Sequence, residues 1–197
     1  RIYRDGISDP IVTQNAKADF RPYMPLIKSP NGKGELTQYS PGHHKHQTGL
    51  YWGFTRVNGR DYFHNPRGDY WQRKSLQVLK NDKGKIGWQT EYSMLDKDGQ
   101  PLITETQAWK IAISKDGKIV MDLKWTGLAH KNITIAKYNY GGLFLRMPWK
   151  RGIKAGVINS EGDMNQKGEG KRAKWIDLGM EIKGLTKEGH IAIFDHP

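Results

Sequence analysis

The 197-residue sequence contains no cysteine. Disulfides, zinc–thiolate sites, thiolate catalysis and iron–sulfur clusters are therefore excluded. It has no apolar run near the roughly 20 residues that a membrane-crossing helix requires, so no membrane span is expected. It also has no convincing stretch with the apolar spacing of a long amphipathic helix. These absences leave a fold built mainly from strands as the natural expectation.

Acidic side chains are few relative to basic ones. The chain has 32 Lys and Arg against 20 Asp and Glu, which gives a formal net charge of +12. The basic residues are spread along the chain, and the densest run, from Lys167 to Lys174, lies in a Gly-rich segment. No helix-turn-helix, zinc-finger or RNA-recognition motif accompanies them. We therefore expect no nucleic-acid partner, while an acidic polysaccharide remains compatible with the charge.

Alternation of apolar and polar residues dominates the chain from about residue 85. This pattern predicts a three-stranded antiparallel meander over residues 85–126, with turns at 96–99 and 115–118. Further strands are expected at 132–139, 142–147, 173–182 and 190–195. The 23 Gly and nine Pro are scattered, which is typical of turns between short strands. The sequence predicts one all-β domain over residues 1–197, an antiparallel β-sandwich.

Three of the seven histidines lie within four residues, at His43, His44 and His46. In an extended chain, His44 and His46 would point to one face and His43 to the other. Histidine transfers protons near neutral pH and also binds metals. A pair on one face therefore indicates either acid–base chemistry on a polar substrate or a metal site. His64, His130 and His190 stand alone in the sequence, and each is more often a surface histidine than a ligand.

Two carboxylates occupy places that packing does not explain. Glu105 shares its predicted strand face with Trp109 and Ile111, where burial would raise its pKa and suit it to acid or base work. A structural role is an equally good interpretation, in which Glu105 lies at a strand end and reaches solvent or pairs with an Arg. Asp195 and His196 follow an apolar strand and put two ionisable groups at a sheet rim, or they simply form a turn.

Several residues suit a sugar-binding surface. Trp52 and Trp175 offer indole faces for sugar rings, although core packing is the commoner role for any one Trp. Arg146 is expected to point away from the apolar face of its strand, toward a cleft or an edge. Asn58-Gly59 predicts a hairpin turn, with Asp61 beside it as a site residue or a turn cap. The expected substrate-binding residues are His43, Trp52, Asn58, Asp61, Arg146, Trp175 and His196.

Ordered motifs run through nearly the whole chain from Phe20. They are Arg21-Pro22-Tyr23, His43-His44-Lys45-His46, Val57-Asn58-Gly59-Arg60-Asp61, Tyr140-Gly141-Gly142-Leu143, Lys171-Arg172-Ala173-Lys174-Trp175 and the closing Asp195-His196-Pro197. Together they resemble the bacterial domain family called PmoA or DUF6807. The family pattern continues past the closing motif, so the resemblance implies further C-terminal strands. The first of the two names suggests a methane oxygenase subunit, which the lack of apolar spans argues against.

The resemblance implies carbohydrate chemistry and an extracytoplasmic location, because members accompany bacterial genes for sugar oxidation and glycan breakdown. The histidines with an inward Glu also resemble galactose-mutarotase-like sandwiches. The first hypothesis is a cofactor-free epimerase, lyase or glycoside hydrolase, with His44 or His46 as acid and Glu105 or Asp195 as base.

Two other hypotheses remain open. One is a jelly-roll metalloenzyme whose divalent metal is bound by His44, His46 and Glu105, or by His196 in place of Glu105. The other is a non-catalytic module that binds a carbohydrate, possibly an anionic one.

Overall fold

The protein is described by a computed structural model that covers residues 1–64, 68–82 and 84–195. Its strands are β1 (Val12–Asn15), β2 (Tyr23–Ile27), β3 (Leu50–Gly53), β4 (Trp71–Asp82), β5 (Lys85–Leu95), β6 (Pro101–Ile113), β7 (Ile119–Ala129), β8 (Gly142–Leu145), β9 (Ala155–Asn159), β10 (Trp175–Met180) and β11 (Gly189–Phe194). A short 3-10 helix, η1 (Asn165–Gly168), is the one helical element of these residues. No helix in the described part is long and apolar enough to span a bilayer.

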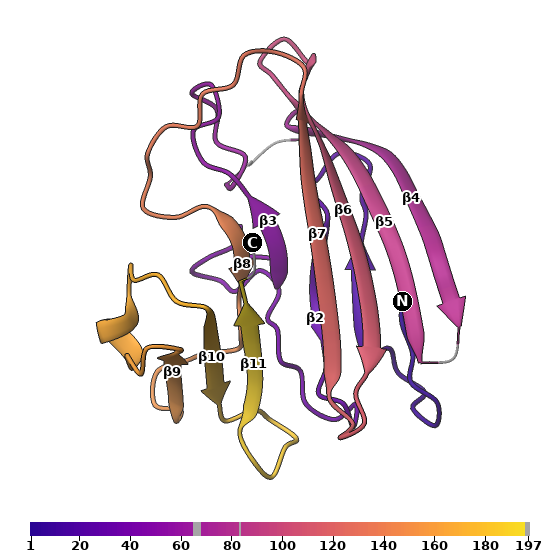
Figure 1. Ribbon diagram of the computed structural model, residues 1–197, viewed down its shortest axis with the longest axis vertical. Coiled ribbons are helices and arrows are strands. Elements are labelled where there is room, and N and C mark those ends of the chain that lie inside the picture. The colour runs from indigo at the N-terminus through magenta and orange to yellow at the C-terminus, as the bar shows by residue number, and fades with distance from the viewer. Residues whose placement is uncertain (65–67, 83, 196–197) are drawn as a thin grey trace.

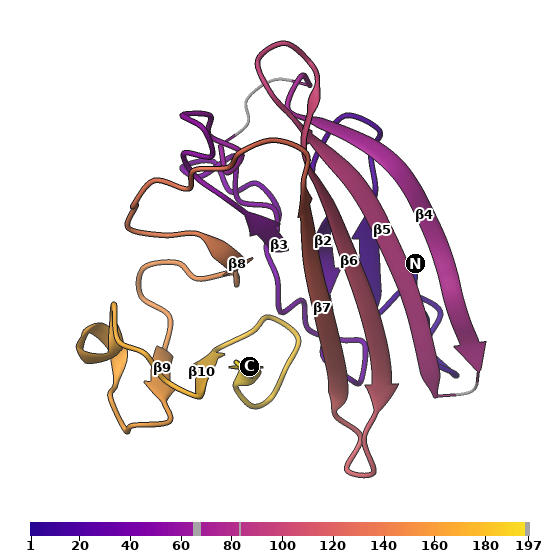
Figure 2. The same ribbon diagram turned by 45° about the horizontal axis from the view of Figure 1, so that its top comes forward.

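The strands form three antiparallel sheets, with the orders β1-β2-β3-β8, β4-β5-β6-β7 and β11-β10-β9. The long β4–β7 sheet lies against the β1-β2-β3-β8 sheet, and the three-stranded sheet stands to one side of them (Figures 1 and 2). The predicted all-β antiparallel sandwich is therefore confirmed.

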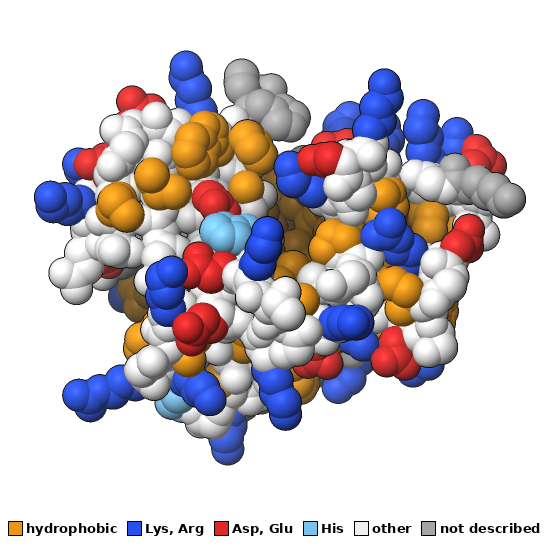
Figure 3. Space-filling model, turned by 90° about the horizontal axis from the view of Figure 1, so that it is seen from below, with side chains coloured by type: hydrophobic (Ala, Val, Ile, Leu, Met, Phe, Trp, Pro, Cys, Tyr) orange, Lys and Arg blue, Asp and Glu red, His pale blue; other side chains and the backbone are white. Residues whose placement is uncertain are grey.

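The sandwich core lies between the two four-stranded sheets. Met24 and Leu50 from one sheet meet Trp88 and Trp109 from the other. The two Trp rings stack with centroids 6.1 Å apart. Each large apolar side chain buried in this way contributes about 1.5–3 kcal/mol. Seen from below, hydrophobic side chains line a hollow at the centre of the molecule, and Lys and Arg are spread around it (Figure 3).

The predicted meander corresponds to β5, β6 and β7, which pair regularly apart from one register shift between Met94 and Leu95. Its turns form where the sequence indicated them. The Asp96 carboxylate accepts the backbone N–H groups of Asp98 and Gln100, and Gly99 and Gly117 take positive φ values of 74° and 82°. Glycine is favoured at these two positions because such φ values strain other residues.

The later strands agree in part with the expectations. Strands β8, β10 and β11 correspond to the segments 142–147, 173–182 and 190–195. The strand expected at 132–139 is wrong. This segment makes a single bridge, Val57↔Ile135, and its backbone bonds satisfy the neighbouring loop around Asn58 instead of a sheet.

Alternation along β3 and β8 gives the first sheet two different faces. Leu50 and Leu145 belong to the sandwich core. Tyr51 and Phe144 point the other way and pack with Phe63. This second side, here called the outer face, carries the loops that hold the histidines.

Candidate functional site

The histidine segment turns twice rather than running extended. The His44 N–H donates to the Pro41 carbonyl at 2.8 Å, and the Gln47 N–H donates to the His44 carbonyl at 2.9 Å. The expected split of the histidines between two faces is therefore wrong. Pro41-Gly42 are turn residues, and these local bonds replace strand pairing. The rings follow one another instead, with centroid separations of 4.7 Å for His43–His44 and 5.8 Å for His44–His46.

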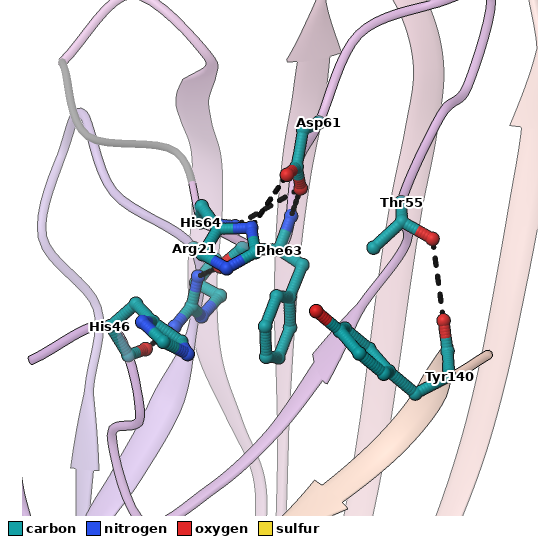
Figure 4. Close-up of polar contacts among 7 residues, drawn as sticks. All are labelled: Arg21, His46, Thr55, Asp61, Phe63, His64 and Tyr140. Atoms are coloured by element: carbon teal, nitrogen blue, oxygen red, sulfur yellow. Dashed lines mark hydrogen bonds and ion pairs between the residues drawn. The ribbon is translucent and has the colours of Figure 1, made fainter. Parts of the chain in front are cut away.

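Arg21 anchors this turn to the next loop. Its side chain is completely buried and donates to the carbonyls of Phe63, at 2.6 Å, and His46. The guanidinium also lies over the Tyr51 ring, 4.2 Å from its centroid. Burial lowers the pKa of Arg21 to about 10, so it stays charged at neutral pH. Arg21 thus fixes where the histidine turn lies on the outer face (Figure 4).

Asp61 and His64 form a hydrogen-bonded pair in the second loop (Figure 4). Asp61 Oδ2 lies 2.6 Å from His64 Nδ1, and Asp61 Oδ1 accepts the N–H groups of Phe63 and His64 at 2.9 and 3.1 Å. Burial opposes ionisation of Asp61, but these hydrogen bonds outweigh it and lower its pKa. An ionised carboxylate only accepts hydrogen bonds, so His64 Nδ1 carries the proton and Nε2 is the basic nitrogen of the neutral ring.

His46 completes this cluster. Its ring lies 4.5 Å from the His64 ring and 4.9 Å from the Phe63 ring, measured between centroids. Burial lowers the pKa of His46, and the nearby charges of His64, His44 and Arg21 lower it further. Near neutral pH His46 is therefore neutral, with one N–H donor and one acceptor nitrogen. We call Asp61, His64 and His46 the outer-face cluster.

Tyr140 connects the outer-face cluster to a cavity of about 700 Å³. Its ring packs 4.9 Å from Phe63, and its carbonyl accepts the Thr55 hydroxyl at 3.3 Å (Figure 4). A hydrogen bond with Tyr138, burial and the charge of Asp61 raise the pKa of Tyr140 to about 12, so the phenol keeps its proton. Most of the residues that line the cavity are exposed, so it is an open hollow on the surface.

Glu105 lies inside the sandwich, as its strand face predicts. It is 1% exposed, and its two oxygens accept Gln107 Nε2 at 2.8 Å and Trp125 Nε1 at 2.9 Å. Gln107 Oε1 in turn accepts Trp109 Nε1 at 3.2 Å. Burial raises the pKa of Glu105 to about 7, although the bonds from Trp125 and Gln107 oppose the rise. An indole N–H can only donate, so the two Trp side chains fix the direction of the whole chain of bonds.

Trp52 and Asn58 have packing partners of their own. Trp52 stacks on Trp125 with ring centroids 5.0 Å apart, on the interior side of β3. Asn58 adopts a φ of 48°, donates to the Asn132 carbonyl and accepts the Thr134 N–H. The predicted turn is confirmed, and the Asn58 side chain holds it against the segment after β7.

Arg146 follows β8 and lies beside Tyr51 on the outer face. Its Nε donates to Gln38 Oε1 at 3.3 Å, and burial lowers its pKa. Its Nη2 is buried and has no hydrogen-bond partner among the described residues. The direction predicted for Arg146, away from Leu143 and Leu145, agrees with the structure.

Asp195 and Trp175 come together at a different place. Both line a smaller hollow of about 170 Å³ at the three-stranded sheet, with Asn159 and Lys171. The residues of this hollow do not include those of the outer-face cluster. His196, the last expected substrate-binding residue, lies outside the described residues.

The ligand set His44, His46 and Glu105 does not form a metal site in this arrangement. Within residues 1–64, 68–82 and 84–195, no group of three or more His, Asp or Glu side chains is placed to hold a metal ion. The divalent-metal hypothesis therefore has no geometric support from these residues.

The sequence pattern of DUF6807, described as a family of unknown function, matches residues 7–197. The chain belongs to the DUF6807 family. No curated protein and no solved structure matches it. The description of the family names no activity.

His64 is the residue of this DUF6807 chain that sequence reasoning missed. The sequence predicts an isolated histidine at this position, yet His64 contacts both Asp61 and His46. A usable signal was present. Asp61 follows the Asn58-Gly59 turn, and a second turn after Asp61 brings a histidine three residues later back to its carboxylate. Arg21 gave no comparable signal, because its partners are backbone carbonyls far along the chain.

Proposed function

We propose that this chain performs acid–base chemistry on a sugar or glycan, of the epimerase, lyase or glycoside hydrolase type, at the outer-face cluster. The observation that carries the proposal is the 2.6 Å contact between Asp61 Oδ2 and His64 Nδ1, with the His46 ring against His64. A histidine whose ring is oriented by a carboxylate and backed by a second histidine is an arrangement suited to proton transfer.

The roles follow from the protonation states. His64 acts as the base through Nε2, because Asp61 holds the proton on Nδ1 and stabilises the imidazolium that forms. His46 is neutral at pH 7, so it can hold a substrate hydroxyl through its one N–H donor and one acceptor nitrogen, while the acid role that the sequence suggested for it stays a prediction. Tyr140 keeps its phenolic proton and can donate a hydrogen bond to a substrate oxygen.

A sugar is the proposed substrate because of the cavity next to Tyr140. Tyr138 and Tyr140 are 39% and 40% exposed, so their rings are accessible to the C–H face of a sugar. We also propose an extracytoplasmic location, because glycan substrates occur there. Glu105 is sealed in the sandwich and Asp195 lies at the smaller hollow, so neither takes part in this scheme.

The proposal is tested with three readouts on a panel of neutral, acidic and oxidised sugars and glycosides. Deuterium uptake from D₂O detects epimerisation, ultraviolet absorbance detects elimination, and new reducing ends detect hydrolysis. We expect turnover that falls about 10²- to 10⁴-fold in His64→Gln. The matched control is His190→Gln. His190 also pairs with a carboxylate, at 3.0 Å from Asp177, but it lies on the three-stranded sheet and should leave turnover unchanged.

The second candidate function is a non-catalytic carbohydrate-binding module. The exposed Tyr138 and Tyr140 rings beside the cavity favour it. Equilibrium binding of a sugar with no turnover in any of the three assays would establish this function and end the catalytic proposal. Turnover that His64→Gln leaves intact would also end it, because the outer-face cluster would then do no chemistry.

A further inference from the structure

The walls of the cavity beside Tyr140 carry positive charge and no negative charge. Its lining includes Tyr138, Tyr140, Gly141 and Arg172, and none of its lining residues is a carboxylate. The nearest acid of the site described above is Asp61, which lies beyond Tyr140. An anionic group entering this cavity therefore meets Arg172 without a competing acid in the wall.

The guanidinium of Arg172 has donors that no described residue uses. Its side chain is exposed, and it makes no ion pair or hydrogen bond with any residue that the structure describes. The adjacent Lys171 differs, because its Nζ is held by Asp163 Oδ1 at 2.7 Å. A guanidinium binds a carboxylate through two parallel N–H donors, with a geometry that lysine does not offer. Arg172 is thus the cavity residue suited to a ligand carboxylate.

The aromatic part of the wall suits a sugar ring. The Tyr138 and Tyr140 rings lie edge to face, 4.8 Å apart at 82°, and both remain accessible. The Arg56 guanidinium lies 4.6 Å from the Tyr138 centroid and adds a second cation near the same wall. An aromatic surface with a guanidinium at its side matches a ring that has a C–H face and one anionic substituent.

Gly141 leaves room for such a ligand. A Cβ placed on Gly141 would have only one heavy atom within 4 Å, the Gly53 carbonyl oxygen at 4.0 Å. The φ of Gly141 lies outside the left-handed region, so an alanine would fit without backbone strain. Because Gly141 lines the cavity, alanine is the smallest side chain that can be added to this part of its wall.

From these observations we infer that the cavity beside Tyr140 binds a uronate, with its carboxylate on Arg172 and its ring against the tyrosines. The inference rests on the proposed function in taking a sugar as the ligand, and it adds the substrate class. Binding is tested by calorimetry or ligand-observed NMR at low ionic strength, with D-glucuronate and D-galacturonate against D-glucose and D-galactose. Wild type, Arg172→Ala, Gly141→Ala and the control Arg151→Ala are compared.

Wild type should bind the uronates about tenfold more tightly than the neutral sugars, as expected for one charge-assisted bidentate contact. Arg172→Ala should bring this ratio close to one. Arg151→Ala, which removes an exposed arginine outside the cavity, should keep the ratio. Gly141→Ala should weaken both classes of sugar alike.

The inference is overturned if wild type binds uronates and neutral sugars equally, or binds neither. It is also overturned if Arg172→Ala keeps the preference, or if Gly141→Ala leaves binding unchanged. A uronate preference lost in Arg172→Ala without turnover supports the inference and ends the catalytic proposal. Turnover of neutral sugars with no uronate preference overturns the inference and supports the catalytic proposal.

Discussion

Two proton-active side chains lie on the two sides of the β1-β2-β3-β8 sheet, and their surroundings differ. His64 on the outer face is 41% exposed and is oriented by Asp61, whereas Glu105 in the interior is 1% exposed and held by Gln107 and Trp125. Glu105 has the pKa that general acid–base chemistry favours, but no substrate reaches it. His64 is accessible and has a defined tautomer. Burial thus shifts the pKa of Glu105 without making it a site, whereas His64 is both accessible to a substrate and oriented by a carboxylate.

The largest expected effect on stability comes from Arg21. Arg21→Met removes the donors to the Phe63 carbonyl, in a buried contact, and to the His46 carbonyl, in a partly buried one. We expect a loss of about 3–5 kcal/mol in the free energy of unfolding, measured with urea. Arg146→Met is the matched control on the same face. It loses one hydrogen bond to Gln38 and should cost only about 1 kcal/mol. Equal losses in the two variants would show that Arg21 does not anchor the loops.

Glu105→Gln should change how stability depends on pH. The pKa of Glu105 is raised from 4.5 to about 7 in the folded protein, so its contribution is fully present below pH 4.5 and is lost as pH rises through about 7. Relative to the glutamine variant, the wild type should lose about 3 kcal/mol of stability between about pH 4 and about pH 9. The same urea titrations at a series of pH values measure this difference.

Parallel pH profiles for wild type and Glu105→Gln would contradict a buried, titrating Glu105. The control variant is Glu91→Gln, on β5 opposite Thr106 and on the other face of the sheet from Glu105. This substitution should change stability by no more than about 0.5 kcal/mol.

Trp125→Phe isolates one hydrogen bond to Glu105. Phenylalanine keeps a ring against Trp52 but cannot donate to Glu105 Oε2. We expect a loss of about 1–2 kcal/mol at alkaline pH, and a smaller loss at acid pH, because the donor stabilises the charged form. The stability difference caused by Glu105→Gln, plotted against pH, should therefore have its midpoint at a higher pH. Trp149→Phe, at an indole that is 50% exposed, should leave that midpoint in place.

Asp61→Asn should have the smallest effect on stability and a large effect on turnover. Asparagine still offers an oxygen to the N–H groups of Phe63 and His64, so stability should change by about 1 kcal/mol or less. Turnover should fall by at least about tenfold, because the His64 tautomer is no longer fixed. A variant that keeps full activity would contradict the role given to Asp61.

The regular part of the fold was accessible from sequence. Strands β5 to β7 alternate cleanly and are joined by turns with Gly at the required positions, so both the meander and the inward direction of Glu105 were predicted. Strand β4 was not. Its pairing with β5 shifts register between Arg73 and Ser75 and again between Val78 and Lys80, which breaks the period of two that reveals a strand.

The site was predicted in part, for a similar reason. His46 and Asp61 were chosen from their local patterns and do lie in one cluster. His64 was not chosen, although its place three residues after Asp61, just past the Asn58-Gly59 turn, was a usable signal. The expected extended path for His43 to His46 was wrong because backbone bonds within the Pro41 and His44 turns replaced pairing with a strand. Long-range contacts such as those of Arg21 leave no local trace in a single sequence.

The central claim is that Asp61 and His64 act as one acid–base unit. A double-mutant cycle on turnover, with Asp61→Asn, His64→Gln and the combined variant, tests it most directly. Asp61 acts only through His64, so the account predicts that the combined variant is no slower than His64→Gln, within about twofold. Losses that multiply in the combined variant would mean that the two residues act independently, and would contradict the account.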